Sequence, residues 1–237
     1  MVASQRRVWF TVDVEPDCPP YLAGYRGVEE GLARLLALLV ERRVTATFFV
    51  TGEVARRYPE RVRAIVAAGH ELGCHGDSHR PFDRMGRAEA AAEIRTAAAA
   101  LRRFAPVAAF RAPHLRFPAA YYPLLAQNGF RVDASRAAYK RSSPGPYPRP
   151  APRCVATSVT SSVLRLPRPI RFAWLRRLAD PVVLFVHPWE LVDLRRERLR
   201  LDCRFNTGAA ARRCIAEVIE FFQRQRAVFC TGRELAA

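Results

Sequence analysis

The sequence predicts an α/β fold in which parallel strands form a barrel surrounded by helices, and two observations support this. Short apolar segments rich in β-branched residues alternate with longer segments of helical periodicity through most of the 237 residues. Acidic, basic or imidazole side chains directly follow several of the apolar segments. In barrels of this kind the carboxyl ends of the strands carry the active site.

The first third of the chain predicts three strands separated by two helices. Residues 8–14 form an apolar, β-branched run that is typical of a strand buried on both faces. Residues 31–43 repeat leucine at helical spacing. A second apolar run at 45–50 precedes a helical pattern at 52–68, and the short segment 71–74 predicts the third strand.

The same alternation continues in the middle of the chain. Residues 87–104 are rich in alanine, the residue with the highest helix propensity, and predict a helix. A short strand is predicted at 108–111. It is followed by a helix at 119–128, which Gly129 ends, and by a strand at 130–133.

The last part of the chain begins with a segment that cannot form regular structure. Residues 142–152 contain five prolines and one glycine, which predict a stiff surface loop or lid. Segments 163–166 and 182–186 predict strands, 209–224 predicts an amphipathic helix, and 227–230 predicts a final strand.

The amino-acid composition limits the classes of protein to which this chain can belong. Half of the residues are hydrophobic, so we expect one domain over residues 1–237 with a substantial core. The formal net charge is +17, yet Lys140 is the one lysine and the arginines are scattered. Because no basic run is interleaved with aromatic residues, specific nucleic-acid binding is disfavoured. Peripheral contact with an anionic membrane surface or an acidic polymer is favoured instead.

Targeting signals and cysteines suggest the compartment. The first ten residues lack the apolar core of a signal peptide, and no run of about 18 apolar residues is present. We therefore expect a cytoplasmic protein, with the inner membrane face as a further option. The six cysteines contain no C-x-x-C pair, which argues against a structural zinc site. A Cys203–Cys214 link stays open.

Residues 70–79, His-Glu-Leu-Gly-Cys-His-Gly-Asp-Ser-His, are the most informative segment for function. His75 and His79 stand four residues apart after a predicted strand and can direct two nitrogen ligands at one divalent metal. Such a site needs an oxygen ligand from elsewhere. Asp13 and Glu15, at the end of the first apolar run, can supply it.

Four further blocks stand in order along the chain: Thr-Val-Asp-Val-Glu at 11–15, Thr-Phe-Phe-Val at 47–50, Phe-Arg-Ala-Pro at 110–113, and Leu-Phe-Val-His-Pro-Trp-Glu at 184–190. With the histidine segment, they resemble the polysaccharide deacetylase (NodB-homology, carbohydrate esterase family 4) superfamily over roughly residues 8–235. The resemblance implies a distorted (β/α)7-type barrel. It also implies a metal-dependent hydrolase that removes an acetyl group from the nitrogen of an amino sugar.

The resemblance assigns roles to the main site residues. It implies that His75 and His79 bind the metal, that Asp13 is the general base and that His187 is the general acid. Many relatives carry a second aspartate where this chain has valine. Strand alternation places Asp13 and Glu15 on the same side, so we assign Glu15 to the metal. The reverse assignment of the two carboxylates stays open.

Further residues follow from the same resemblance. Arg111 matches an arginine that pairs with the catalytic aspartate and keeps it ionised. The peptide N–H of His114 is expected to stabilise the oxyanion. Asp133 is the candidate to orient His187, although the Asp-Trp pair of many relatives is missing. Trp189 is expected to form an apolar wall for the sugar or acyl group.

Other polar residues near these motifs are interpreted as structural. His70 precedes its strand and so lies at the opposite end, and Asp77 is expected to shape the loop between the two histidines. Glu190 and Asp193 are interpreted as solvated loop charges. The arginine cluster at 195–200 predicts a solvated face, with an anionic-lipid or phosphate contact as the alternative.

Taken together, the sequence predicts a metal-dependent deacetylase of a nucleotide- or lipid-linked saccharide or polysaccharide precursor. Zn²⁺ is favoured, and Co²⁺, Ni²⁺ and Fe²⁺ also suit two nitrogens and one oxygen. Removal of a formyl group is an alternative, as is hydrolysis of a linear or cyclic amide such as a ureide or imide. A non-catalytic carbohydrate-binding barrel is a more distant alternative, and nucleic-acid binding is the weakest. The sequence does not predict the oligomeric state.

Overall fold

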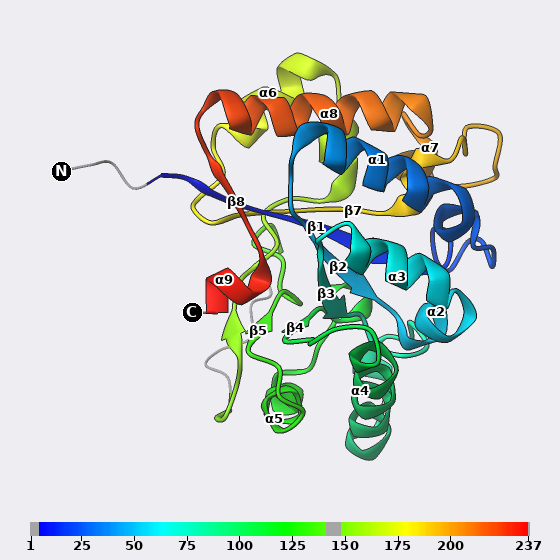
Figure 1. The fold of residues 1–237 in the computed structure, drawn as a ribbon, viewed down its shortest axis with the longest axis vertical. Coiled ribbons are helices and arrows are strands. Elements are labelled where there is room, and N and C mark those ends of the chain that lie inside the picture. The colour runs from blue at the N-terminus through cyan, green and yellow to red at the C-terminus, as the bar shows by residue number, and fades with distance from the viewer. Residues whose placement is uncertain (1–4, 141–147, 237) are drawn as a thin grey trace.

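A parallel sheet that curls into a half-barrel forms the centre of the molecule, as the computed structural model of residues 5–140 and 148–236 shows (Figure 1). The strand order is β6-β5-β4-β3-β2-β1-β7, and β8 also pairs with β1. The strands are β1 (Arg7–Val14), β2 (Thr47–Val50), β3 (Glu71–Cys74), β4 (Ala109–Phe110), β5 (Val132–Asp133), β6 (Arg153–Cys154), β7 (Val182–Val186) and β8 (Val228–Cys230). The predicted α/β barrel is therefore confirmed.

Strand β1 pairs with three other strands of this sheet. Along one edge it pairs with β7, from Val8 to Val12. Along the other edge its first residues pair with β8 and its last residues pair with β2. The remaining opening of the barrel, between β6 and β7, is spanned by an irregular segment. There Ser158 and Val183 exchange two hydrogen bonds of 2.9 Å.

Helices cover the outside of the sheet (Figure 1). They are α1 (Leu32–Arg42), α2 (Gly52–Arg57), α3 (Pro59–Ala67), α4 (Arg87–Arg102), α5 (Tyr122–Gln127), α6 (Arg168–Leu175), α7 (Leu201–Arg204), α8 (Ala209–Arg224) and α9 (Gly232–Ala236). Single turns are the π-helical η1 (Gly27–Gly31) and the 3₁₀ turns η2 (Phe82–Arg84), η3 (Pro113–Leu115), η4 (Ala119–Tyr121), η5 (Ser161–Arg165) and η6 (Pro188–Leu191). The leucine repeat predicted α1, in which Leu32, Leu35, Leu38 and Leu39 are buried in the core.

The two faces of the strands have different surroundings. Outward-facing residues such as Phe10 and Val12 join the large apolar core beneath the helices. Inward-facing residues such as Trp9 and Phe49 form a smaller cluster inside the barrel. Helix α9 packs against this cluster, where a Cβ added to Gly232 would lie 2.8 Å from Trp9. Alternation along β1 then places Asp13 on the inward face, beyond the apolar filling.

Some predicted elements were wrong in type or extent. The segment predicted as a strand at 163–166 is the 3₁₀ turn η5, in which Leu164 and Arg165 are both buried instead of alternating. The helix predicted at 52–68 is divided at Tyr58, because proline follows. The sequence did not predict α6, α7, α9 or β6. Part of the predicted loop at 142–152 lies outside the described residues.

Two further findings concern cysteines and membrane spans. None of the six cysteines forms a disulfide bond, so the Cys203–Cys214 link is not formed. Cys18 and Cys203 instead lie in the same small apolar cluster. Within the described ranges, no helix is long and apolar enough to cross a lipid bilayer.

Two glycines allow the first helical segment to approach the segment after β7. A Cβ added to Gly31 would lie 2.0 Å from the backbone oxygen of Pro188, and one added to Gly27 would lie 2.5 Å from the backbone nitrogen of Trp189. Backbone atoms cannot move aside as a flexible side chain can. These glycines therefore set the distance between η1 and η6.

We predict that Gly31→Ala lowers the free energy of unfolding by about 1–3 kcal/mol, because the added methyl group overlaps backbone. Helix propensity alone favours alanine by about 1 kcal/mol, so the sign of the change tests the packing. Urea unfolding followed by circular dichroism measures it. Gly86→Ala is the control, since nothing lies within 4 Å of its added Cβ, and should change stability by less than about 0.5 kcal/mol. A Gly31→Ala variant as stable as the parent would contradict this account.

Candidate active site

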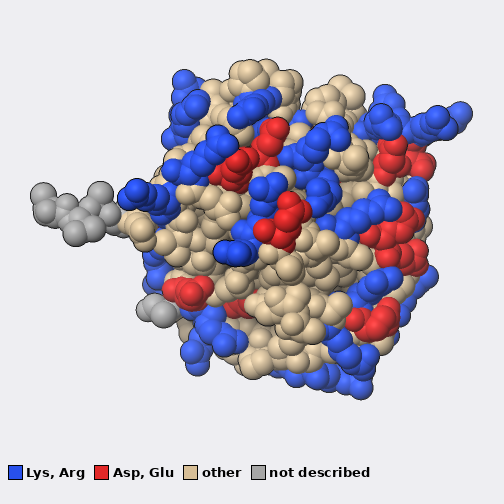
Figure 2. Space-filling view, turned by 45° about the horizontal axis from the view of Figure 1, so that its top comes forward, with Lys and Arg blue, Asp and Glu red and all other residues tan. Residues whose placement is uncertain are grey.

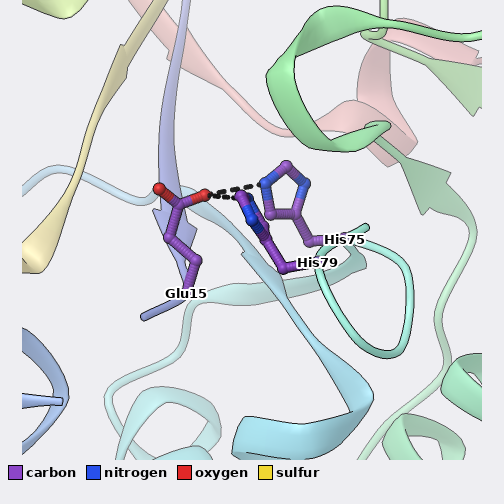
Figure 3. A group of neighbouring side chains, drawn as sticks. All are labelled: Glu15, His75 and His79. Carbon is purple, nitrogen blue, oxygen red and sulfur yellow. Dashed lines mark hydrogen bonds and ion pairs between the residues drawn. The ribbon is translucent and has the colours of Figure 1, made fainter. Parts of the chain in front are cut away.

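Glu15, His75 and His79 converge at the carboxyl end of the strands (Figure 3). Oε2 of Glu15 lies 3.1 Å from Nε2 of His75 and 2.6 Å from Nε2 of His79. All three side chains are buried, and their ligand atoms lie within 4.8 Å of one another. Glu15 directly follows β1, while both histidines come from the loop after β3. The structure thus brings together the three residues that the sequence predicted as metal ligands.

The hydrogen bonding of His75 indicates that a cation fits between these groups. Nδ1 of His75 donates to the backbone carbonyl of Arg111 at 2.8 Å, so Nε2 is the ring nitrogen turned towards Glu15. Burial opposes ionisation of Glu15, but His79, His187 and His75 hold its pKa well below the usual range. Nε2 of His75 and the Glu15 carboxylate therefore meet in a dry site, where a cation between them, a proton or a metal ion, stabilises the contact. Two imidazoles, one of them fixed through Nδ1, and a carboxylate are a suitable donor set for a divalent metal.

The loop that carries both histidines is held from two helices. Arg56 of α2 donates two hydrogen bonds, of 2.7 and 2.9 Å, to the carboxylate of Asp77. Glu93 of α4 accepts hydrogen bonds from the backbone N–H groups of Asp77 and Ser78. These contacts maintain His79 in the left-handed backbone conformation, with φ of 60°, that a non-glycine residue rarely adopts. Asp77 therefore shapes the loop, as predicted.

Asp13 lies inside the barrel and is paired with Arg111. Nη1 of Arg111 donates to Oδ1 of Asp13 at 2.6 Å and to Oγ1 of Thr11 at 2.7 Å. The guanidinium is fully buried and stacks over Phe49, with 4.4 Å to the ring centroid. Because Phe49 holds the guanidinium of Arg111 in place, the carboxylate of Asp13 that pairs with it is also held. The structure therefore places Arg111 beside Asp13, as the sequence predicted.

His187 is oriented by Glu190, which the sequence analysis interpreted as a solvated charge. Oε1 of Glu190 accepts hydrogen bonds from Nδ1 of His187 at 2.8 Å and from its backbone N–H at 3.0 Å. Glu190 is fully buried, and its other oxygen pairs with Nε of Arg165 at 2.8 Å. With Nδ1 engaged in this way, Nε2 of His187 faces the metal site, 3.7 Å from Oε1 of Glu15.

The surrounding charges favour the protonated form of His187. Burial lowers its pKa, but Glu15 and Glu190 outweigh burial and raise the pKa to about 9. The pKa of Glu190 is lowered, since Arg165 and His187 outweigh its burial. His187 is therefore able to hold a proton at neutral pH and to release it from Nε2 into the site.

Asp133 does not orient His187, so that prediction was wrong. Its carboxylate accepts hydrogen bonds from Ser135 and from the hydroxyl of Tyr122, and burial raises its pKa to about 6. The physical reason is the sheet order, in which four strands separate β5, which carries Asp133, from β7. Glu190, which lies in the same turn as His187, makes the hydrogen bond to Nδ1 of His187 that was expected of Asp133. The charge at Asp193 is exposed, as predicted, and pairs with Arg195.

The site residues line a cavity of about 260 Å³. The ring of Trp189 stacks on that of His187, with centroids 4.7 Å apart, so Trp189 supports the imidazole and also contributes to the wall. The ring of His114 packs edge-on against His79, with centroids 4.8 Å apart. Both residues predicted to bind substrate therefore lie at the cavity. Its wall also includes Tyr139, Phe185 and Lys140, which the sequence analysis did not single out.

The arrangement has three parts with separate chemistry. A divalent-metal site lies at the centre. A carboxylate fixed by an arginine, Asp13, can accept a proton, and an imidazole fixed by a carboxylate, His187, can donate one. These parts suit hydrolysis of an amide or an ester, in which water is activated and a leaving group is protonated.

Comparison with known proteins agrees with this geometry. The family model described as polysaccharide deacetylase matches residues 2–132, more than half of the chain. The chain is 30% identical over 167 residues to a chitooligosaccharide deacetylase of Bradyrhizobium sp. (strain ANU 289), and the match covers 68% of each protein.

Solved structures share the fold. A carbohydrate esterase family 4 pseudoenzyme from Bacillus anthracis superposes with a TM-score of 0.68 at 16% identity, covering 99% of this chain and 66% of that one. A family 4 carbohydrate esterase from Streptomyces lividans, in complex with acetate, superposes with a TM-score of 0.64 at 19% identity, covering 96% of this chain and 92% of that one. At these identities the two structures establish the architecture alone. The family match over residues 2–132 shows that the chain belongs to the polysaccharide deacetylase family.

Proposed function

We propose that the protein is a metal-dependent N-deacetylase that acts on an acetylated amino sugar. The observation that carries the proposal is the convergence of Glu15, His75 and His79 between a fixed carboxylate and a fixed imidazole. The family membership and the chitooligosaccharide deacetylase relative support the choice of an acetylated saccharide as substrate.

The roles follow from where each side chain is held. Glu15, His75 and His79 would hold a divalent ion, which would supply a Lewis acid for polarising the acyl carbonyl and lowering the pKa of water. Asp13, held by Arg111, accepts the proton of the attacking water. His187, held by Glu190, donates a proton from Nε2 to the nitrogen of the departing amine. The apolar surfaces of Trp189 and Phe185 exclude bulk water from this proton transfer.

The finer assignment concerns the metal and the carrier of the sugar. Two nitrogens and one oxygen favour Zn²⁺, and Co²⁺, Ni²⁺ and Fe²⁺ are also compatible. The net charge of +17 favours a nucleotide- or lipid-linked saccharide and peripheral contact with an anionic membrane surface. We further propose a cytoplasmic location, in keeping with a substrate of this kind.

The direct test is acetate release. The purified protein, loaded with Zn²⁺ or Co²⁺, should release acetate from acetylated chitooligosaccharides and leave products lighter by one acetyl group in mass spectrometry. Formate from an N-formyl sugar would indicate a deformylase. Ammonia or a ring-opened product from a ureide or imide would indicate the non-sugar alternative. Binding of a saccharide without product from any substrate would indicate a non-catalytic carbohydrate-binding barrel. Salt-dependent DNA binding that survives loss of the metal ligands would indicate a nucleic-acid-binding protein.

We predict that Asp13→Asn and Glu15→Gln fail in different ways. Asp13→Asn should retain about one metal ion per chain and lose about 10²- to 10⁴-fold in kcat, because it removes the proton acceptor. Glu15→Gln should lose the metal itself on dialysis, as measured by elemental analysis. The opposite pattern, in which Asp13→Asn loses the metal and Glu15→Gln retains it, would reverse the two roles.

We predict that Glu190→Gln lowers kcat about 100-fold and shifts the alkaline limb of the pH profile to lower pH. The acid must be protonated to act, and the Glu190 charge raises the pKa of His187, so its removal lowers that pKa. Asp133→Asn is the matched control, another buried carboxylate made neutral, and should change kcat only a few-fold. Because Glu190→Gln leaves Arg165 unpaired, both variants are assayed where circular dichroism shows them folded. Equal losses in the two variants would contradict the assignment.

A further inference from the structure

A wide groove of about 820 Å³ opens beside the metal site. It shares His79 and His114 with the cavity that holds the candidate catalytic groups. One wall is the segment after β1, which includes the exposed ring of Tyr21. A substrate larger than one sugar can therefore extend from the cavity into this groove.

The groove is rich in positive charge. Its lining includes one acidic residue, Asp202, and a set of cations: Arg80, Arg84, Arg116, Lys140 and Arg200. Three of the cations have counter-ions nearby: Arg80 pairs with Glu89, Arg200 with Asp202, and Arg116 with Asp83 at a long 3.8 Å. Among the ion pairs of the described residues, none includes Arg84 or Lys140.

Positive charge is also present elsewhere on the surface, where acidic side chains lie among the basic ones. Figure 2 turns the helices at the top of Figure 1 towards the viewer, and basic and acidic side chains are intermixed over that face. On α8, Arg212 pairs with Glu41 and Arg224 pairs with Glu220. Ion pairs thus offset part of the positive charge on that face, although Arg213 of α8 is in none of the ion pairs of the described residues. The groove differs in that its cations lie beside the candidate metal site.

Two of the groove cations repel each other. Partial burial of Lys140 lowers the pKa of its ammonium group, and the charge of Arg116 lowers it further. Nζ of Lys140 reaches the backbone oxygen of His114, 3.4 Å away, which holds the ammonium at the junction of groove and cavity. Like charges held together next to a binding cavity are stabilised by an anionic ligand.

We propose that this groove binds a phosphate group of the saccharide substrate, with Arg84, Arg116 and Lys140 as its ligands. The inference rests on the proposed deacetylase function and narrows its substrate to a phosphate-linked saccharide. Guanidinium groups present paired N–H donors that match phosphate oxygens, and the ammonium adds a third positive charge. A nucleotide and a lipid carrier both offer this phosphate chemistry.

The test compares matched substrates on the metal-loaded full chain. They are a neutral acetylated chitooligosaccharide, the same oligosaccharide with a terminal phosphate, and one with a terminal uronate. UDP-N-acetylglucosamine and a short-chain prenyl diphosphate-linked N-acetylglucosamine distinguish the nucleotide carrier from the lipid carrier. We expect kcat/KM for the phosphorylated oligosaccharide to exceed that for the neutral one about tenfold, with the advantage falling as salt rises.

Substitutions of the groove cations test whether the preference for the phosphorylated substrate comes from this groove. In the Arg84→Gln/Lys140→Gln double variant, the ratio of kcat/KM for phosphorylated over neutral substrate should fall about tenfold. The control is Arg177→Gln/Arg213→Gln, which removes the same net charge at two exposed arginines outside the groove and should leave the ratio unchanged.

The outcomes separate this inference from the proposed function. Hydrolysis of neutral and phosphorylated substrates with equal kcat/KM would overturn the phosphate site and leave the deacetylase intact. A higher kcat/KM for the uronate than for the phosphate would also overturn the phosphate site. An equal fall of the phosphorylated-to-neutral ratio in both double variants would overturn it as well. If no substrate releases acetate, the proposed function fails. Calorimetric titration of the two oligosaccharides into parent and double variant then still decides the groove, since the phosphorylated one should bind the parent more tightly.

Discussion

The pairing of strand β1 on both edges is the constraint on which the site depends. This strand carries Asp13 on its inward face and leads directly into Glu15, and it is buried along nearly its whole length. A strand held on both sides by β2, β7 and β8 cannot shift in register without moving its neighbours. The two carboxylates therefore occupy fixed positions before any ligand arrives. The histidine loop and the segment after β7 are then positioned against them.

Buried charges form the second level of this organisation. Arg111 and Arg165 are both almost completely inaccessible, and each faces one carboxylate, Asp13 or Glu190. Arg165 also donates to the backbone carbonyl of Asp202 at 2.7 Å, so it ties α7 to the site. Desolvation of such charges is costly, and their geometry must be good to offset it. The result is a carboxylate and an imidazole whose partners fix the direction in which each side chain points.

Much of the site could be predicted because ends of parallel strands meet at one edge. Asp13, His75 and His187 each end or follow a strand with a clear apolar pattern, so their convergence followed from the alternation. Glu190 was missed because a charge three residues after a strand, beyond a proline, usually faces solvent. Its burial depends on Arg165, a partner distant in sequence that pattern analysis placed in a strand. The apolar residues on either side of Glu190, Trp189 and Leu191, were the one local signal that this turn is buried.

The pairing of β1 also determines how the chain can fold. The first strand requires β7 and β8, formed by residues 182–186 and 228–230, to complete its edges. Contacts so distant in sequence carry a large loop-closure entropy and slow the folding of a domain. During synthesis β1 therefore stays apolar and unpaired on one edge until residues 182–186 have emerged. Removal of residues 228–230 would in turn expose the edge of β1 at Arg7–Trp9.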